Sequence, residues 1–160
     1  MKVLFYLRKN HKEVKGGDLV QIYSTADALK KIGVEITFSS DPKENLQKFD
    51  IVHLFNSPRF EETESFINNA ISQKKPTVFS TIFWPKDELA VGIASSKIVR
   101  LCRNIIGIKA TLTLWRIFKL RDSKFLVEKR IFESVDMLLP NSEGEMRQIM
   151  KVFGIKNKPY

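Results

Sequence analysis

The sequence predicts an α/β domain in which helices cover both faces of an open, mostly parallel sheet. Short apolar segments alternate with helical ones along the whole chain, which is typical of parallel sheets. The apolar segments are nearly continuous runs, as expected for strands that are buried on both sides. The chain has 160 residues, and 43% of them are hydrophobic, which is enough for one core. We therefore expect a single domain over residues 1–160.

The first strand–helix–strand unit spans residues 1–38. An apolar run over residues 3–7 predicts the first strand, and residues 34–38 predict the second. Between them, apolar residues recur at steps of three and four, which places them on one face of a helix: Leu19, Ile22, Tyr23, Ala26, Leu29 and Ile32. Asp18 is expected to cap the start of this helix and Gly33 to end it.

Two adjacent glycines, Gly16 and Gly17, stand in the turn before this helix. Glycines permit a positive φ and let a ligand approach the backbone, and a helix N-terminus favours an anion such as a phosphate. With Asp18 they form a candidate phosphate loop. A tight entry into the helix explains the two glycines equally well. The turn is neither Gly-x-Gly-x-x-Gly nor a P-loop, so a site for NAD or ATP within this chain is not expected.

Three further strands are predicted over residues 50–55, 77–83 and 136–140, and a helix is predicted over residues 61–73. Ser142 is expected to start the last helix and Gly154 to end it. Ligands in open α/β sheets bind beyond the carboxyl ends of the strands. The residues expected to line one cleft with the glycine turn are Asn56, Trp84, Asn141, Ser142 and Glu143. His53 lies inside the third strand, where a hydrogen-bonded core histidine is favoured over a catalyst.

Composition argues against several kinds of protein. The lone Cys102 cannot form an internal disulfide and is typical of a reducing cytoplasm. With one cysteine and two histidines, a zinc site has too few of its usual ligands, so no metal is expected. No apolar run approaches the ~20 residues of a membrane span. The N-terminus has no pattern of signal-peptide cleavage.

The net charge of +9 is concentrated in one stretch. Residues 97–121 contain no acid and seven cations: Lys97, Arg100, Arg103, Lys109, Arg116, Lys119 and Arg121. A helical excursion is predicted over about residues 93–133, divided at Gly107. Its apolar residues recur at steps of three and four and form a seam: Ile98, Leu101, Ile105, Ile108, Leu112 and Trp115.

Three interpretations of this basic stretch are open. Its helices pack on the core and leave a solvated basic surface, or they lie on an anionic membrane, or they bind nucleic acid. The interleaved apolar side chains suit a lipid interface better than a groove for phosphates. The candidates for facing a membrane are Lys97, Arg100, Arg103, Arg116 and Lys119.

The order and spacing of four segments resemble the N-terminal domain of GT-B glycosyltransferases of family 4 (glycosyl transferase group 1). These segments are the Gly16-Gly17 turn before a helix, Ala-Leu-x-x-x-Gly at residues 28–33 leading into Val-Glu-Ile-Thr, Phe-Asp-Ile-Val-His at residues 49–53, and Val-Asp-Met-Leu-Leu-Pro-Asn-Ser-Glu at residues 135–143. Each segment alone is a weak signal, but together they extend over nearly the whole chain.

The resemblance implies one of two Rossmann-like domains that face each other across a cleft, here the one that holds the acceptor. The nucleotide-sugar domain is expected to be absent from this chain, so the fragment alone is expected to be inactive. The resemblance also implies that Gly16 and Gly17 lie over the donor diphosphate and the acceptor. Asn141, Ser142 and Glu143 match the segment that lines the cleft.

The catalytic residue is not assigned. Many family members have a histidine just after the fourth strand, whereas this chain has Thr-Ile-Phe-Trp-Pro at residues 81–85. Asp87 and Glu88 are acid–base candidates only if they face the cleft. An Asp-x-Asp motif is absent, as in GT-B enzymes that work without a divalent metal, so no cofactor is expected.

The expected function is transfer of a sugar from a nucleotide-sugar donor to a glycan or lipid-linked acceptor, with retention of configuration, in cell-surface polysaccharide synthesis. The expected location is the cytoplasm, peripheral on the inner face of the cell membrane. The alternative from another class is a non-catalytic flavodoxin-like or receiver-like binding module, although no acidic cluster follows the first strand. Nucleic-acid binding rests on charge alone and is not expected.

Overall fold

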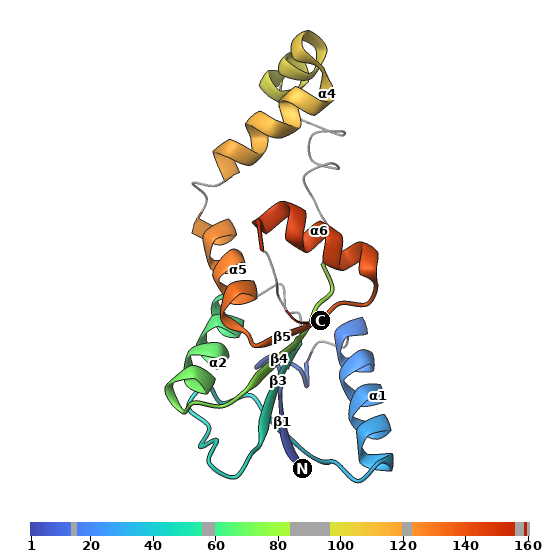
Figure 1. The fold of residues 1–160 in the computed structure, drawn as a ribbon, viewed down its shortest axis with the longest axis vertical. Helices are drawn as coiled ribbons and strands as arrows, with labels where there is room; N and C mark the ends of the chain where they lie inside the picture. The colour runs from blue at the N-terminus through green and yellow to red at the C-terminus, as the bar shows by residue number, and fades with distance from the viewer. Residues whose placement is uncertain (14–15, 56–59, 84–96, 120–122, 156–158, 160) are drawn as a thin grey trace.

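A computed structural model describes residues 1–13, 16–55, 60–83, 97–119, 123–155 and 159, with the backbone alone for residues 115–119. Strands and helices follow one another along the chain, as Figure 1 shows, and β3 follows β2 with no helix between them. In chain order the elements are β1 (Lys2–Tyr6), α1 (Gly17–Lys31), β2 (Glu35–Ser39), β3 (Ile51–Phe55), α2 (Phe60–Ser72), β4 (Thr77–Ser80), α4 (Lys97–Lys119), α5 (Ser123–Ser134), β5 (Met137–Leu139) and α6 (Glu143–Phe153).

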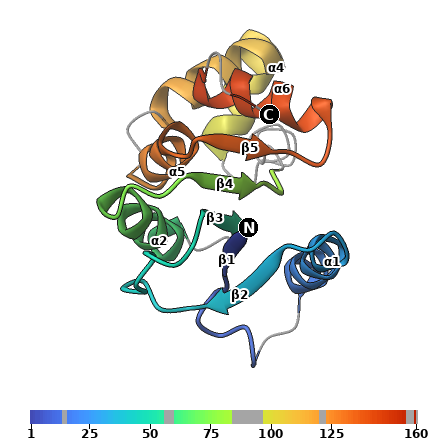
Figure 2. The ribbon, with the colours of Figure 1, turned by 60° about the horizontal axis from the view of Figure 1, so that its bottom comes forward.

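The five strands form one sheet in the order β2-β1-β3-β4-β5, and every neighbouring pair is parallel. Helix α1 covers one face of the sheet, and α2 and α5 cover the other (Figure 2). The predicted α/β domain with a parallel sheet is therefore confirmed. The predicted strand positions agree with the structure to within a few residues; the largest difference is in β4, which ends at Ser80 and not at residue 83.

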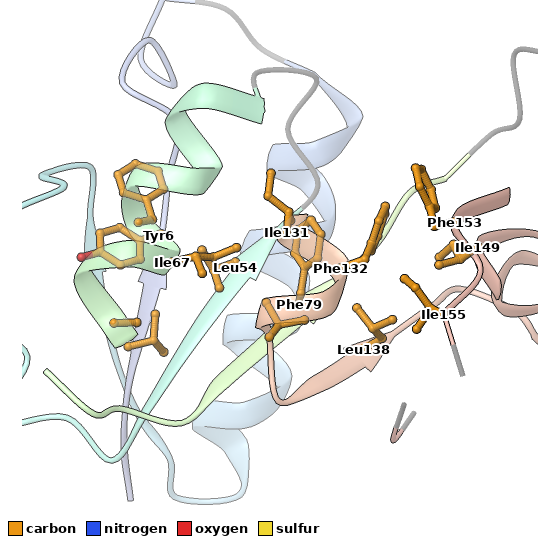
Figure 3. Close-up of a cluster of buried hydrophobic side chains, with 14 of the residues drawn as sticks. Tyr6, Leu54, Ile67, Phe79, Ile131, Phe132, Leu138, Ile149, Phe153 and Ile155 are labelled. Carbon is orange, nitrogen blue, oxygen red and sulfur yellow. The ribbon is translucent and has the colours of Figure 1, made fainter. Parts of the chain in front are cut away.

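Alternate residues of β1 supply two separate hydrophobic clusters. Leu4 and Tyr6 belong to the cluster on the α2 and α5 side, whereas Val3 and Phe5 belong to the cluster under α1. The larger cluster continues across the sheet to α5 and α6, as Figure 3 shows. This alternation is the period of a strand that is buried on both faces.

Three of the four residues predicted to start or end a helix have that role in the structure. Gly33 follows Ile32, the C-cap residue of α1, and has a φ of 84°. In α6 the Ser142 side chain caps the start, and Gly154 ends the helix with a φ of 69°. The prediction that Asp18 caps α1 is wrong. The helix begins at Gly17 with Gly16 as its N-cap, two residues before the predicted cap, and the Asp18 carboxylate pairs with Arg8 instead.

Helix α4 stands away from the sheet at the end of the molecule (Figure 1). Gly107 interrupts it with a φ of 79° and a ψ of 165°, so the predicted division at this glycine is confirmed. None of the helices in the described ranges is both long and apolar enough to cross a bilayer. The interpretation of the seam as core is wrong for the residues on either side of the kink, which are exposed: Ile98, Leu101, Ile105 and Ile108.

Strand β5 forms one edge of the sheet. Its middle residue, Leu138, is fully buried, while Met137 and Leu139 on either side of it are exposed. The Leu138 N–H points outward and donates to the carbonyl of Pro159 at 3.0 Å. The end of the described chain therefore lies against the outer side of β5.

Candidate functional site

The helix that follows the glycine turn is joined to the segment that follows β5. Gln21, in the second turn of α1, donates from Nε2 to Oδ1 of Asn141 at 3.1 Å. Asn141 in turn donates from Nδ2 to the carbonyl of Thr81, at 2.8 Å, just beyond β4. Three elements that are far apart in the sequence thus meet at the carboxyl edge of the sheet.

Glu145 organises this edge from the first turn of α6. Its carboxylate accepts from the Thr81 hydroxyl at 2.7 Å, from the Phe83 N–H at 2.6 Å and from the Asn141 N–H at 2.8 Å. The Glu145 N–H donates to the Ser142 hydroxyl at 3.1 Å. This arrangement is a variant of the capping box, in which a Ser-x-x-Glu spacing closes a helix start. Sequence reasoning did not identify Glu145, although the spacing is visible in Ser-Glu-Gly-Glu at residues 142–145.

The predicted cleft residues have different surroundings. Gly17, Asp18, Asn141 and Ser142 lie on the elements that the contact between Gln21 and Asn141 joins. Glu143 is exposed and forms an ion pair with Arg147 along the surface of α6, at 3.5 Å. Their joint role in a cleft stays a prediction.

The structure does not describe the remaining residues that the sequence placed in the cleft. Asn56 and Trp84 lie outside the described residues, as do the acid–base candidates Asp87 and Glu88. Two residues that the sequence did not single out, Gln21 and Thr81, are joined to the site through Asn141. No pattern in the sequence marked them, because each contributes through a partner about 60 residues or more away.

Arg8 and Asp18 fill the space beside the glycine turn. The Arg8 Nε donates to Oδ2 of Asp18 at 2.8 Å, its Nη2 to Oδ1 of Asp18 at 3.4 Å, and its Nη1 to Oδ1 of Asn10 at 3.0 Å. Both charged side chains are at least 80% buried, with exposed fractions of 10% and 20%. This bidentate contact with the Asp18 carboxylate holds the Arg8 guanidinium in one orientation.

The two glycines have different reasons to be glycine. A Cβ on Gly16 would lie 2.5 Å from Oδ1 of Asp18, so the ion pair occupies the space that a side chain would need. A Cβ on Gly17 would meet nothing within 4 Å. Gly16 does not use the positive φ that glycine permits, because its φ of −146° is ordinary extended backbone. Packing therefore accounts for Gly16, whereas no internal contact accounts for Gly17.

This difference gives a prediction about stability. Gly16→Ala is expected to lower the free energy of unfolding by about 1–3 kcal/mol, because the added methyl displaces the Asp18 carboxylate. Gly17→Ala is expected to leave it unchanged or to raise it by up to about 1 kcal/mol, because alanine favours a helix more than glycine does. Urea denaturation of both variants measures the difference. Equal losses would show that Gly17 also has a packing role.

The topological switch point of the sheet lies between β1 and β3, and it contains a small cavity. The cavity is lined by Tyr6, Arg8, Leu54, Phe55, Glu62, Thr63 and Phe66, and it has room for about one water molecule. The Glu62 carboxylate accepts from the Lys9 N–H at 2.7 Å through Oε1. Its Oε2 is buried without a hydrogen-bond partner among the described residues. A nucleotide does not fit in this cavity.

Both helices that start near this point have acids in their first turn. Helix α1 has Asp18, and α2 has Glu61 and Glu62. Arg8 pairs with the Asp18 carboxylate, whereas the acids at the start of α2 use the favourable field of that N-terminus and repel a further anion. The described part of this edge therefore suits neutral hydroxyl and amide groups better than a free phosphate.

His53 is a buried core residue. Its Nε2 lies 2.8 Å from the Ser80 hydroxyl, and its ring stacks on Phe55 and meets Phe5 edge to face. Burial lowers the pKa of His53 from 6.5 to about 4, so the imidazole is neutral at neutral pH. The interpretation as a hydrogen-bonded core histidine is confirmed.

Neither a metal centre nor a known relative identifies the site. Among the described residues, no group of three or more His, Cys, Asp or Glu side chains is placed to hold a metal ion. Comparison of the chain with protein-family models, with curated proteins and with solved structures gave no significant match. Function is therefore inferred from the motifs and from the geometry of the edge.

Proposed function

We propose that this chain is the acceptor-binding domain of a retaining GT-B glycosyltransferase. The enzyme moves a sugar from a nucleotide-sugar donor to a glycan or lipid-linked acceptor in cell-surface polysaccharide synthesis. The observation that carries the proposal is the hydrogen bond between Gln21 and Asn141. It joins the helix of the glycine turn to the segment after the last strand, and the family resemblance places both segments in the cleft.

The chemistry of this edge supports a role in holding the acceptor. Gln21, Asn141 and Ser142 present amide and hydroxyl groups, which match the hydroxyls of a sugar in both donating and accepting hydrogen bonds. The open space beside Gly17 lets a ligand approach the backbone. The carboxylates at the start of α2 disfavour a diphosphate there, so the cations that bind the donor are expected from the second domain of such an enzyme.

A flavodoxin-like or receiver-like binding module is the second candidate, and the strand order favours it. The order β2-β1-β3-β4-β5 is the one found in flavodoxin-like folds. The loop after β1 argues against a receiver, because Arg8, Lys9 and Asn10 stand where an acidic cluster is needed. The cavity for about one water at the switch point argues against a flavin there.

An NMR titration of the ¹⁵N-labelled chain tests the proposal. Short saccharides and a lipid-linked sugar analogue are expected to shift the amide signals of Gly17, Gln21, Asn141 and Ser142. A nucleotide sugar is expected to bind at best with a millimolar Kd, worth about −4 kcal/mol. The chain alone is expected to transfer no sugar.

Gly17→Ala provides the matched variant, because a methyl there fills the open space beside the backbone without touching the protein. It is expected to weaken acceptor binding at least tenfold, or about 1.4 kcal/mol. Ser24→Ala, at an exposed position on the same helix, is expected to have no effect. Micromolar binding of a nucleotide sugar would overturn the proposed division between the domains. Micromolar binding of flavin mononucleotide would support the second candidate.

A further inference from the structure

Four residues of the apolar seam of α4, Ile98, Leu101, Ile105 and Ile108, are exposed. Before the kink, the exposed fractions are 74% for Ile98, 59% for Leu101 and 71% for Ile105; just after it, Ile108 is 49% exposed. The spacing of the first three places them on one side of the helix. Large aliphatic side chains gathered at this exposure usually mark a surface that binds a partner.

Cations are interspersed with the seam residues in the sequence of α4. Lys97, Arg100 and Lys109 are exposed, and Arg103 is partly buried. Residues 97–121 contain seven cations and no acid, while the rest of the chain has a charge of 9 − 7 = +2. The partner of this surface is therefore anionic as well as apolar.

We propose that α4 docks on the surface of an anionic lipid bilayer. Ile98, Leu101 and Ile105 enter the boundary between headgroups and acyl chains. Lys97, Arg100 and Lys109 lie among the lipid phosphates. Other occupants fit less well: a second copy would bring the same uncompensated cations together, and the phosphates of a nucleic acid leave the exposed aliphatic side chains without a partner.

The position of α4 supports this role. The helix projects from the end of the molecule opposite to β1 (Figure 1), so a flat surface can reach it without meeting the sheet. Its described residues, 97–119, contain no stretch long and apolar enough to cross a bilayer, so the attachment proposed is in the plane of the interface.

Co-sedimentation with lipid vesicles tests the proposal on the full chain. The wild-type chain is expected to sediment with vesicles of phosphatidylcholine and phosphatidylglycerol and not with phosphatidylcholine alone. Lys97→Glu, Arg100→Glu and Lys109→Glu, made together, are expected to lower the partition coefficient by more than about a hundredfold, since each cation contributes about fivefold. Ile98→Asn, Leu101→Asn and Ile105→Asn, made together, are expected to abolish the part of binding that survives high salt.

Two control variants match these changes in number and exposure elsewhere on the surface. Lys12→Glu, Lys31→Glu and Lys43→Glu make the same change in charge at exposed positions far from α4 in the sequence. Val20→Asn, Ile32→Asn and Ile71→Asn remove apolar side chains that are 68%, 75% and 50% exposed. Both are expected to bind vesicles nearly as the wild type does. Equal losses in a control and its matched α4 variant would overturn the proposal.

A fluorescent label makes the test independent of whether the triple variants fold. An environment-sensitive dye on Ile105→Cys, in a Cys102→Ser background, is expected to shift to shorter wavelength with anionic vesicles. The same dye on Ile71→Cys is expected not to shift. Absence of the shift at position 105, absence of wild-type sedimentation at low salt, or displacement of the vesicles by an equal charge of duplex DNA would overturn the proposal. So would self-association that the asparagine variant abolishes.

These measurements use no sugar substrate, so the docking proposal and the proposed function succeed or fail separately.

Discussion

Phe132→Ala is expected to lower the free energy of unfolding by about 3–5 kcal/mol. Phe132 is 2% exposed. Its ring meets those of Phe79, Phe83 and Phe153, with centroids 5.7, 6.2 and 4.9 Å away. Figure 3 shows the residue between β4 and α6. Its removal leaves a cavity where strand, loop and helix meet.

Leu126→Ala provides the control for this prediction. Leu126 lies on the same helix but is 44% exposed, so its truncation is expected to change stability by no more than about 0.5–1 kcal/mol. Urea denaturation of both variants at neutral pH measures the difference. A loss under about 1 kcal/mol for Phe132→Ala would mean that α5 and α6 contribute little to the cooperative core.

Acidification is expected to remove about 3 kcal/mol of stability through His53 alone. The pKa of His53 is about 4 in the folded chain and 6.5 ordinarily, because burial disfavours the imidazolium. Between these values the unfolded chain binds the additional proton, so stability is fully present above pH 6.5 and falls as the pH decreases towards 4. A difference of 2.5 pKa units corresponds to about 3 kcal/mol.

A double variant separates this effect from the carboxylates that titrate in the same region. His53→Leu with Ser80→Ala removes the imidazole and the hydroxyl that bonds it, so that no polar atom is left unpaired. The loss of stability between pH 7 and pH 4 is expected to be about 3 kcal/mol smaller in this variant than in the wild type. His11→Gln, at a less buried histidine, serves as the control. A pH dependence that the double variant leaves unchanged would rule out His53 as its source.

The strands were predictable from sequence because parallel strands buried on both faces are nearly continuous apolar runs. The order of the strands was not predictable. It depends on which side of β1 the third strand pairs with, and the apolar residues of β3 suit either side equally well. Local signals were reliable where the partner is close in sequence, as for Ser142 and Gly154 at the ends of α6.

Distant partners account for most errors. Asp18 has the side chain of a good cap, but the guanidinium of Arg8, ten residues earlier, holds its carboxylate. Periodicity identified the apolar seam of α4 and could not indicate whether protein, lipid or water lies against it. Within the candidate site, Asn141 and Ser142 came from a motif, whereas Gln21 and Thr81 belong to it only because the fold brings them to Asn141.

The contact between Leu138 and Pro159 bears on how the protein avoids aggregation. An edge strand usually presents free N–H and C=O groups that a second molecule can extend into a larger sheet. Here the outward N–H of β5 is occupied by the Pro159 carbonyl. Proline has no N–H to donate in return, and β5 is only three residues long. The edge beside the proposed site is therefore a poor template for strand addition.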